Sequence, residues 1–282
     1  MTETLDGRAV SAKIREDVAR GASELQEVGV TPTLAVVVAT DDEASHAYVR
    51  SISRAANVVG IETRICDLGP SATSAELSAT ILELSDDDDV HGIIVQTPLP
   101  QGVVPAEATS SIPAAKDVDG AGALSAGRLF KGLPAFAPAT AQAVMEILGY
   151  YSVPLTGANV VVIGRSQVVG RPAAELLLRA DATVTVCHSK TVDLPAIART
   201  ADVLVVAMGK PRVVGRAFVR HGAVVIDVGT NFDVDGSLLG DVDAEAIDGL
   251  ARALTPVPGG VGPVTTAVLL RNTLAAVPRG PS

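Results

Sequence analysis

Short apolar runs rich in β-branched residues alternate along this chain with longer helical segments, and this alternation most constrains its fold. The strand-like runs cover residues 33–40, 90–96, 159–164, 183–188, 203–208 and 223–229. Helical periodicity between such runs is typical of parallel sheets connected by crossover helices. A second series of runs begins near residue 157. The sequence therefore predicts an α/β protein of two α/β domains, with a boundary near residues 148–156 and a Rossmann-type parallel sheet in the second.

Charge and composition exclude several classes of partner. The net charge is −10 and aromatic residues make up only 2% of the chain, which argues against nucleic acid and against an anionic membrane as the main partner. No apolar run approaches the ~18 residues of a membrane span. The N-terminus is acidic and polar, without the pattern of a signal peptide, so we expect a cytoplasmic protein. Cys66 and Cys187 form no metal-type spacing, and we expect no bound metal.

The stretch VVVIGRSQVVGRP, residues 160–172, follows a strand and opens a helix. A dinucleotide's pyrophosphate meets backbone amides and a helix N-terminus at such a place. The glycine fingerprint is imperfect, because Ser166 and Val169 stand where two glycines are usual and Gly170 comes one place late. A plain connection from strand to helix is the alternative interpretation of this stretch.

The next strand-like run ends in CHSKT, residues 187–191. An NAD site usually has a carboxylate there, which hydrogen-bonds the ribose hydroxyls. Here Ser189 and Lys190 take that place, and Arg165 of the preceding loop can lean toward them. Such a group suits a 2′-phosphate and predicts NADP. A solvated polar strand end is the alternative.

Several motifs together resemble one family, the methylenetetrahydrofolate dehydrogenase/methenyltetrahydrofolate cyclohydrolase enzymes. They are LDGRAVSAKI, VHGIIVQTPLP, AKDVDG, GRSQVVGRP, TVTVCHSKT and TPVPGGVGPVTTAVLL, in this order through nearly the whole chain. The resemblance implies an active-site cleft between the two α/β domains, and a homodimer. It also implies that residues 1–148 plus 263–282 bind folate and carry the catalytic residues, and that residues 149–262 form the NADP-binding Rossmann domain.

The resemblance further implies roles for particular residues. The implied catalytic residues are Tyr48, Gln96 and Asp119. The implied cofactor-binding residues are Gly164, Arg165, Ser166, Gly170, Ser189 and Thr230. The implied substrate-binding residues are Tyr48, Asp119, Pro258, Gly259, Gly260, Val261, Gly262, Pro263 and Thr265.

Physical chemistry alone leaves simpler roles open for three of these features. Asp119 could accept two N–H donors from a pterin edge, or it could be a turn residue before Gly120. Tyr48 could pack in the core on one face of a helix. The loop over residues 256–265 could approach a flat ligand through its glycines, or it could be a tight surface loop.

The sequence departs from the family pattern at one decisive position. The bifunctional enzymes have a lysine four residues after the tyrosine, and here Ile52 occupies that place. Hydride transfer depends mainly on positioning two rings, whereas hydrolysis needs protons to be moved. We therefore expect an NADP-dependent oxidation of 5,10-methylenetetrahydrofolate with weak or absent cyclohydrolase activity. The alternatives are a full bifunctional enzyme with another proton carrier, and a weakly catalytic folate-binding protein.

Overall fold

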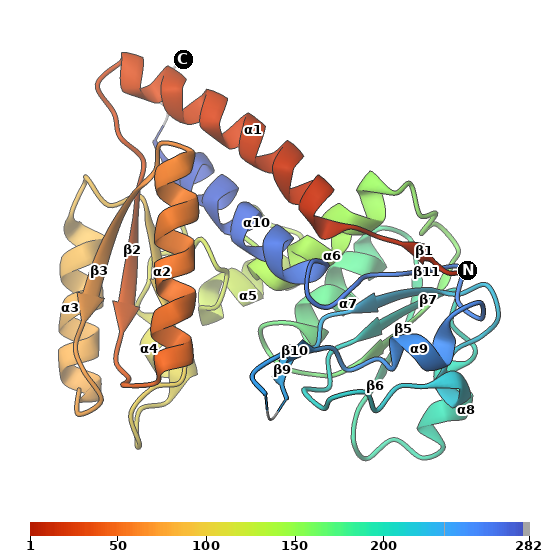
Figure 1. Cartoon of the computed structure of the whole chain (residues 1–282). Coiled ribbons are helices and arrows are strands. Elements are labelled where there is room, and N and C mark those ends of the chain that lie inside the picture. Colours follow the sequence, from red (N-terminus) through yellow and green to blue (C-terminus); the bar gives the residue numbers. More distant parts are fainter. Residues whose placement is uncertain (234, 279–282) are drawn as a thin grey trace. The chain divides into compact units, whose positions relative to one another are not determined.

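The computed structural model describes residues 1–233 and 235–278. The chain forms two compact units. Unit 1 comprises residues 1–11 and 140–265, and unit 2 comprises residues 12–139 together with the segment from Thr266 onward. Each unit contains parallel strands and helices, so the predicted α/β class with two α/β domains is confirmed (Figure 1). Within the described residues, no helix is both long and apolar enough to cross a bilayer.

Unit 2 is built on a small parallel sheet with the strand order β3-β2-β4. The strands are β2 (Thr33–Val38), β3 (Glu62–Asp67) and β4 (Gly92–Val95). Every residue of β2 is buried, as expected for the central strand of a sheet covered on both faces. In the edge strand β3, Thr63 and Cys66 are partly buried and the other four residues are exposed.

Helices α2 (Glu43–Val58) and α3 (Ser74–Asp86) cover the opposite faces of this sheet (Figure 1). Both start at side chains that accept a hydrogen bond from an otherwise unpaired backbone N–H, Asp42 for α2 and Thr73 for α3. The shorter helices of unit 2 are α4 (Pro105–Ser110) and α5 (Ala123–Phe130). Three more helices, α1 (Gly7–Glu27), α6 (Ala139–Tyr150) and α10 (Val261–Ala276), contain residues of both units.

Unit 1 contains a six-stranded parallel sheet with the order β1-β11-β8-β7-β5-β6. Its strands are β1 (Glu3–Thr4), β5 (Asn159–Ile163), β6 (Thr183–Cys187), β7 (Val203–Val206), β8 (Val224–Asp227) and β11 (Ala253–Leu254). The chain leaves β5 toward β6 on one side and returns to β7 on the other. The strand order therefore reverses at β5, and in open α/β sheets ligands bind beyond the carboxyl ends of the strands at such a point.

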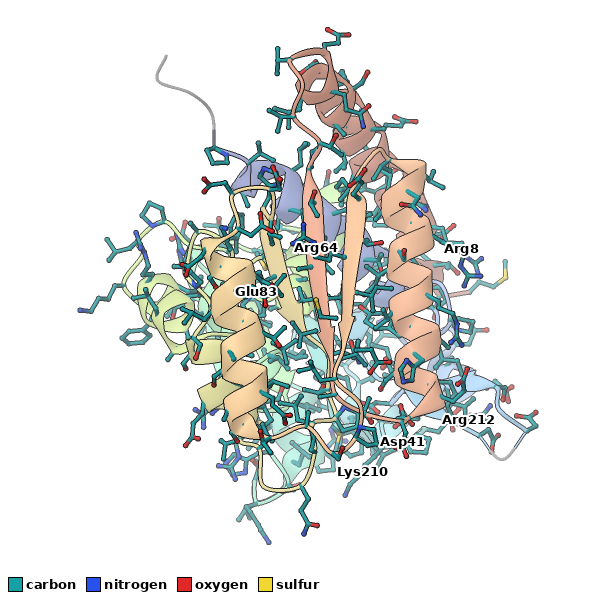
Figure 2. The ribbon with its side chains drawn as sticks, turned by 90° about the vertical axis from the view of Figure 1, so that its left-hand side faces the viewer. Arg8, Asp41, Arg64, Glu83, Lys210 and Arg212 are labelled. Atoms are coloured by element: carbon teal, nitrogen blue, oxygen red, sulfur yellow. The ribbon has the colours of Figure 1, made fainter. Side chains whose placement is uncertain are left out.

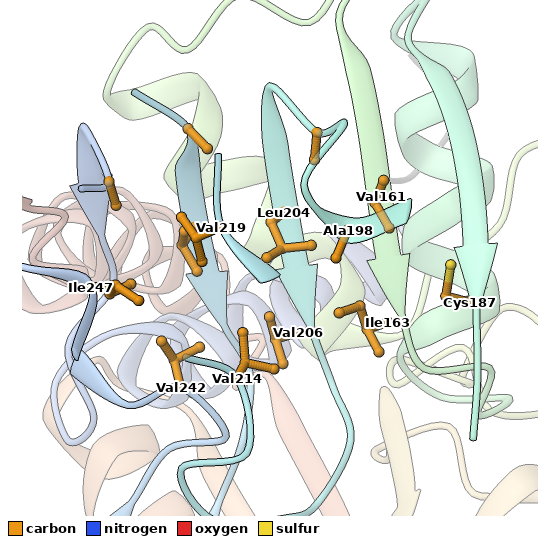
Figure 3. Packing of buried hydrophobic residues seen from close by; sticks show 14 residues of the cluster. Val161, Ile163, Cys187, Ala198, Leu204, Val206, Val214, Val219, Val242 and Ile247 are labelled. Carbon is orange, nitrogen blue, oxygen red and sulfur yellow. The ribbon is translucent and has the colours of Figure 1, made fainter. Parts of the chain in front are cut away.

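Apolar side chains from these strands pack under short connecting helices (Figure 3). Val161, Leu204 and Val206 of the sheet meet Ala198 of α8 (Leu194–Ala198) and Ile247 of α9 (Ala244–Ile247) in one cluster. The remaining elements of unit 1 are α7 (Gly170–Arg179), the 3-10 turn η1 (Arg216–Phe218) and a hairpin of β9 (Asn231–Phe232) and β10 (Leu238–Leu239). This packing fixes the strand ends from which the candidate site is built.

Candidate active site

The turn between β5 and α7 is shaped by a glycine that no other residue could replace without a shift. Gly164 has φ of +141°, and a Cβ atom there would lie 2.3 Å from the carbonyl oxygen of Ala207, at the end of β7. The hydroxyl of Ser166 accepts hydrogen bonds from the backbone N–H groups of Val169 (3.2 Å) and Gly170 (3.3 Å). The predicted residues Gly164, Ser166 and Gly170 therefore form one tight turn that leads into the N-terminus of α7.

Three further predicted cofactor residues lie at carboxyl ends of strands in the same sheet. Arg165 follows β5, Ser189 follows β6 and Thr230 follows β8, and all three are exposed. Two hydrogen bonds of His188 order the turn after β6. The backbone N–H of Lys190 donates to Nδ1 of His188 (3.1 Å), and the backbone N–H of His188 donates to the Thr191 hydroxyl (2.9 Å). No ion pair holds Arg165 in the described part of the chain, so its guanidinium is available to an anion.

Tyr48 in unit 2 lies on α2 with 39% of its surface exposed. Its hydroxyl forms a hydrogen bond with Thr266, and the carboxylate of Asp119 is close enough to act on it electrostatically. Desolvation, with a smaller contribution from the negative charge of Asp119, raises the pKa of Tyr48 to about 12. Tyr48 is therefore a neutral phenol at physiological pH. Core packing, the simpler interpretation of its position, does not fit this exposure.

Asp119 has a carboxylate with acceptor capacity to spare. In the described residues its one hydrogen bond comes from the backbone N–H of Ala139, at 3.2 Å to Oδ1. Burial raises the pKa of Asp119 to about 6, and the neighbouring charge of Asp117 acts in the same direction. Asp117 serves the turn itself, because its two oxygens accept the N–H groups of Ala121 and Gly122, each at 3.0 Å. Asp119 is thus left for a ligand.

Gln96 follows β4 directly, and its side-chain amide donates to the carbonyl oxygen of Thr97 (2.7 Å). The hydroxyl of Ser45, one turn before Tyr48 on α2, donates to the same oxygen (3.3 Å). This bond ties the start of α2 to the segment that carries Gln96. Ser45 and Thr266 were not predicted as site residues, because their partners are distant in sequence and no local pattern marks them.

Ile52 is fully buried. It belongs with Ser45, Val49 and Ala56 to the face of α2 that packs on the sheet. Its side chain has no polar atom, so Ile52 cannot carry a proton at the position where the sequence resemblance implies a lysine.

The glycine-rich segment expected as a loop over residues 256–265 ends earlier than predicted. Helix α10 begins at Val261, so Val261, Gly262, Pro263 and Thr265 lie in its first turns. Proline is tolerated at Pro263 because the first N–H groups of a helix have no partner within it. The Thr265 hydroxyl bonds back to the carbonyl of Val261 (3.2 Å). Only the part that includes Pro258, Gly259 and Gly260 is a true loop, and Gly7 N–H donates to the Gly259 carbonyl (2.9 Å).

No cluster of three or more metal-ligating side chains occurs among residues 1–233 and 235–278. A parallel sheet with a tight glycine turn before a helix, and exposed polar residues at neighbouring strand ends, defines unit 1 as a dinucleotide-binding domain of the Rossmann type.

Comparison with known proteins identifies the family. Residues 5–119 match the family model of the tetrahydrofolate dehydrogenase/cyclohydrolase catalytic domain, and residues 138–280 match that of the tetrahydrofolate dehydrogenase/cyclohydrolase NAD(P)-binding domain. The chain belongs to the tetrahydrofolate dehydrogenase/cyclohydrolase family.

Close relatives align over nearly their whole length. The bifunctional protein FolD of Parafrankia sp. (strain EAN1pec) is 57% identical over 272 residues, which cover 96% of this chain and 98% of the relative. The bifunctional protein FolD 1 of Saccharopolyspora erythraea is 55% identical over 278 residues, which cover 99% and 95%.

Solved structures give the same result. The bifunctional FolD methylenetetrahydrofolate dehydrogenase/cyclohydrolase of Campylobacter jejuni superposes with a TM-score of 0.96 at 42% identity, covering 98% of this chain and 99% of that one. The Trypanosoma brucei FolD, solved with NADP cofactor and an inhibitor, has a TM-score of 0.93 at 37% identity and covers 98% and 97%.

Proposed function

We propose that this protein oxidises 5,10-methylenetetrahydrofolate to 5,10-methenyltetrahydrofolate by hydride transfer to NADP. The observation that carries the proposal is the match of both family domains, together with the tight glycine turn at Gly164 in unit 1. Unit 1 would hold the dinucleotide and unit 2 the folate. The predicted domain boundaries, 1–148 plus 263–282 and 149–262, are part of this proposal.

The residues of unit 1 fit a phosphorylated dinucleotide. The N-terminus of α7 would favour the pyrophosphate through the positive end of its dipole, because the N–H groups of Gly170 and Arg171 already donate to Ser166. Arg165 and Ser189 are exposed at adjoining strand ends, where a 2′-phosphate would gain a charge-assisted hydrogen bond and a hydroxyl donor. When bound, the nicotinamide ring supplies the hydride acceptor. Thr230 and the turn around Gly164 would contact the bound cofactor.

The residues of unit 2 fit the pterin end of a folate. The spare oxygen of Asp119 can accept the paired N–H donors of the pterin edge, as a carboxylate does with a guanidinium. Tyr48 stays neutral, so it can pack against the ligand and donate one hydrogen bond without adding charge. The amide of Gln96 would contact the one-carbon unit, and the segment containing Pro258, Gly259 and Gly260 would line the pocket.

We propose that hydrolysis of the methenyl product is weak, because Ile52 is buried and apolar where a proton carrier is needed. A positioned acid or base typically contributes ~10²–10⁴-fold to such a step. The printed names of the relatives favour the second candidate, a full bifunctional enzyme producing 10-formyltetrahydrofolate. That enzyme would need a different proton carrier, and Asp119 is the titratable group best placed for it.

A paired assay on the purified protein tests both candidates. Reduction of NADP with methylenetetrahydrofolate and decay of methenyltetrahydrofolate are followed separately, and the first is repeated with NAD. We expect NADP reduction to be fast, NAD reduction slower, and methenyl decay close to the uncatalysed rate. Fast decay that is lost in Asp119→Asn would establish the bifunctional enzyme. NADP binding without reduction would instead establish a folate-binding protein of little catalytic activity.

The structure also supports the predicted homodimer through the open edge of β3, which pairs only with β2 in the described chain. Ile65 of β3 is 48% exposed there. Arg64 and Glu83 flank the edge on the α3 side, with α2 on the other (Figure 2). A second copy paired antiparallel across a two-fold axis perpendicular to the sheet would continue the sheet, with α2 beside the same helix of its partner.

A further inference from the structure

Two buried carboxylates, Asp227 and Asp241, lie near the carboxyl ends of β7 and β8. The proposed chemistry gives neither of them a direct role. Asp241 is fully buried and Asp227 is 3% exposed. The oxygens of Asp227 accept the N–H groups of Gly229 (2.9 Å), Asp241 (3.0 Å) and Val242 (2.9 Å). Asp227 thereby holds the backbone of Asp241 in place. The side chain of Asp241 in turn holds residues 208–210 and Asn231.

Asp241 binds the three residues that follow the end of β7. Its Oδ2 accepts the N–H groups of Met208 (2.5 Å) and Gly209 (3.0 Å), and its Oδ1 accepts that of Lys210 (2.7 Å). These residues come immediately after Ala207, whose carbonyl packs on Gly164 of the dinucleotide turn. The carboxylate thus fixes the loop next to the turn that would hold the pyrophosphate.

The carboxylate of Asp241 also contacts both sequence neighbours of Thr230. Asn231, the next residue, donates its side-chain amide to Oδ1 of Asp241 (2.9 Å). Gly229, the preceding residue, lies so close that a Cβ atom there would be 2.5 Å from the Asp241 carboxyl carbon. Thr230 itself is exposed, and in the described part of the chain it forms no hydrogen bond with the carboxylate of Asp227 or Asp241. One buried side chain therefore sets the backbone on either side of an exposed residue that is a candidate cofactor contact.

We propose that Asp241 is a positioning residue for the nicotinamide nucleotide, which holds Thr230 and the loop 208–210 in the arrangement that binds it. This proposal rests on the proposed NADP-dependent function. All four hydrogen-bond partners of Asp241 are donors, so the site requires a group with two acceptor oxygens. Asparagine has the same shape but presents an N–H₂ group to at least one of these donors, which would displace either the loop or the residues around Thr230.

The test is Asp241→Asn, with Asp235→Asn as the matched control. Asp235 is exposed on the same hairpin, and it accepts only local hydrogen bonds within the turn, from Ser237. Binding of NADPH is measured by its fluorescence, together with KM for each substrate and the thermal unfolding midpoint. We expect Asp241→Asn to weaken NADPH binding by roughly tenfold, the scale of one lost hydrogen bond to a charged group. KM for the folate should be unchanged, and Asp235→Asn should match wild type.

A merely structural role would lower the unfolding midpoint and the active fraction, while the folded protein kept its NADPH affinity. That result in Asp241→Asn would overturn the proposal. Asn231→Ala gives a second measurement, because it removes the bond from Asn231 to Asp241, together with a bond to the Leu239 carbonyl (3.3 Å), and leaves the Asp241 carboxylate with its three backbone donors. It should weaken NADPH binding less than Asp241→Asn, and an equal or larger effect would overturn the role of the loop 208–210. Wild-type protein that bound no NADPH would contradict the proposed function itself.

Discussion

At the scale of single residues, the proposal of weak hydrolysis rests on Ile52, a fully buried apolar side chain. Replacing Ile52 by Lys is expected to raise methenyltetrahydrofolate hydrolysis above wild type, since Tyr48 one turn earlier, Gln96 and Asp119 are already in place. The same change puts a charge in a fully buried position and should cost a few kcal/mol of unfolding free energy.

Both effects can be measured on one preparation, by the hydrolysis assay and by denaturant unfolding. Ile52→Met is the control, because it keeps the volume and apolar character of the side chain without adding a proton carrier. A folded Ile52→Lys protein with no gain in hydrolysis would show that more than this residue is missing. Rapid hydrolysis by wild type would show that residue 52 is not needed.

Asp119 offers a second prediction for a single residue, in which stability and binding change in opposite directions. Its pKa is about 6 in the folded protein and ordinarily 3.8, so folding favours the protonated form. The ionised group therefore destabilises the fold increasingly as pH rises from about 3.8 to about 6, and fully above that. At pH 7, Asp119→Asn should be more stable than wild type by roughly 1–2 kcal/mol of unfolding free energy, and it should unfold at a higher temperature. This advantage should vanish near pH 4.

Folate binding should follow the opposite course. Wild type should lose affinity for the folate as pH falls below about 6, because the protonated carboxyl can no longer accept two N–H donors. Asp119→Asn should bind weakly at every pH. The exposed Asp88→Asn is the control in the same unit. Folate affinity that does not change between pH 7 and pH 5 would remove Asp119 from the pterin site.

Among the elements, the first turn of α1 restrains the loop before α10. Gly7 N–H bonds to the Gly259 carbonyl, and a Cβ atom on Gly7 would lie 1.8 Å from the Gly260 carbonyl oxygen. Gly7→Ala must push this loop away, at a cost of about 1–3 kcal/mol of unfolding free energy. KM for the folate should rise while NADPH affinity stays unchanged, because this loop is proposed to line the folate pocket.

Gly149→Ala is the matched control for that change. Gly149 lies in α6, and a Cβ atom there meets nothing within 4 Å. The control should therefore be neutral or slightly stabilising, by ~0.5–1 kcal/mol, since alanine is the better helix former. An unchanged folate KM in Gly7→Ala would separate the loop from substrate binding.

Elements differ in how far the sequence predicts them. The longer buried strands, such as β2 and β5, were predicted because buried parallel strands need runs of β-branched residues. The two-residue strands β1 and β11 were not, because they are too short to show such a run. The start of α10 was placed too late, because the glycines and prolines before Val264 indicate a loop as strongly as a helix start. Candidate site residues with a local pattern, such as Gly164 and Asp119, could be proposed from the sequence. Asp241 and Thr266 could not be, because their partners lie on other elements, and only the folded chain brings them together.

For the whole molecule, we propose that two copies assemble through unit 2. The open edge of β3 exposes backbone N–H and C=O groups that a second copy can satisfy, and an unpaired edge otherwise invites aggregation. Wild type is expected to sediment with twice the 28.6 kDa mass of the chain. Ile65→Lys places a charge at the middle of this edge, where dimer formation would bury it without a partner. The dimer dissociation constant should therefore rise by at least about tenfold, which shifts the protein to the monomer. Leu178→Lys, an equally exposed position on α7 of unit 1, should remain a dimer. A dimer that persists in Ile65→Lys would place the interface on another surface. Neither substitution touches a candidate site residue. Dehydrogenase activity in the monomer would therefore show that each chain carries a complete site.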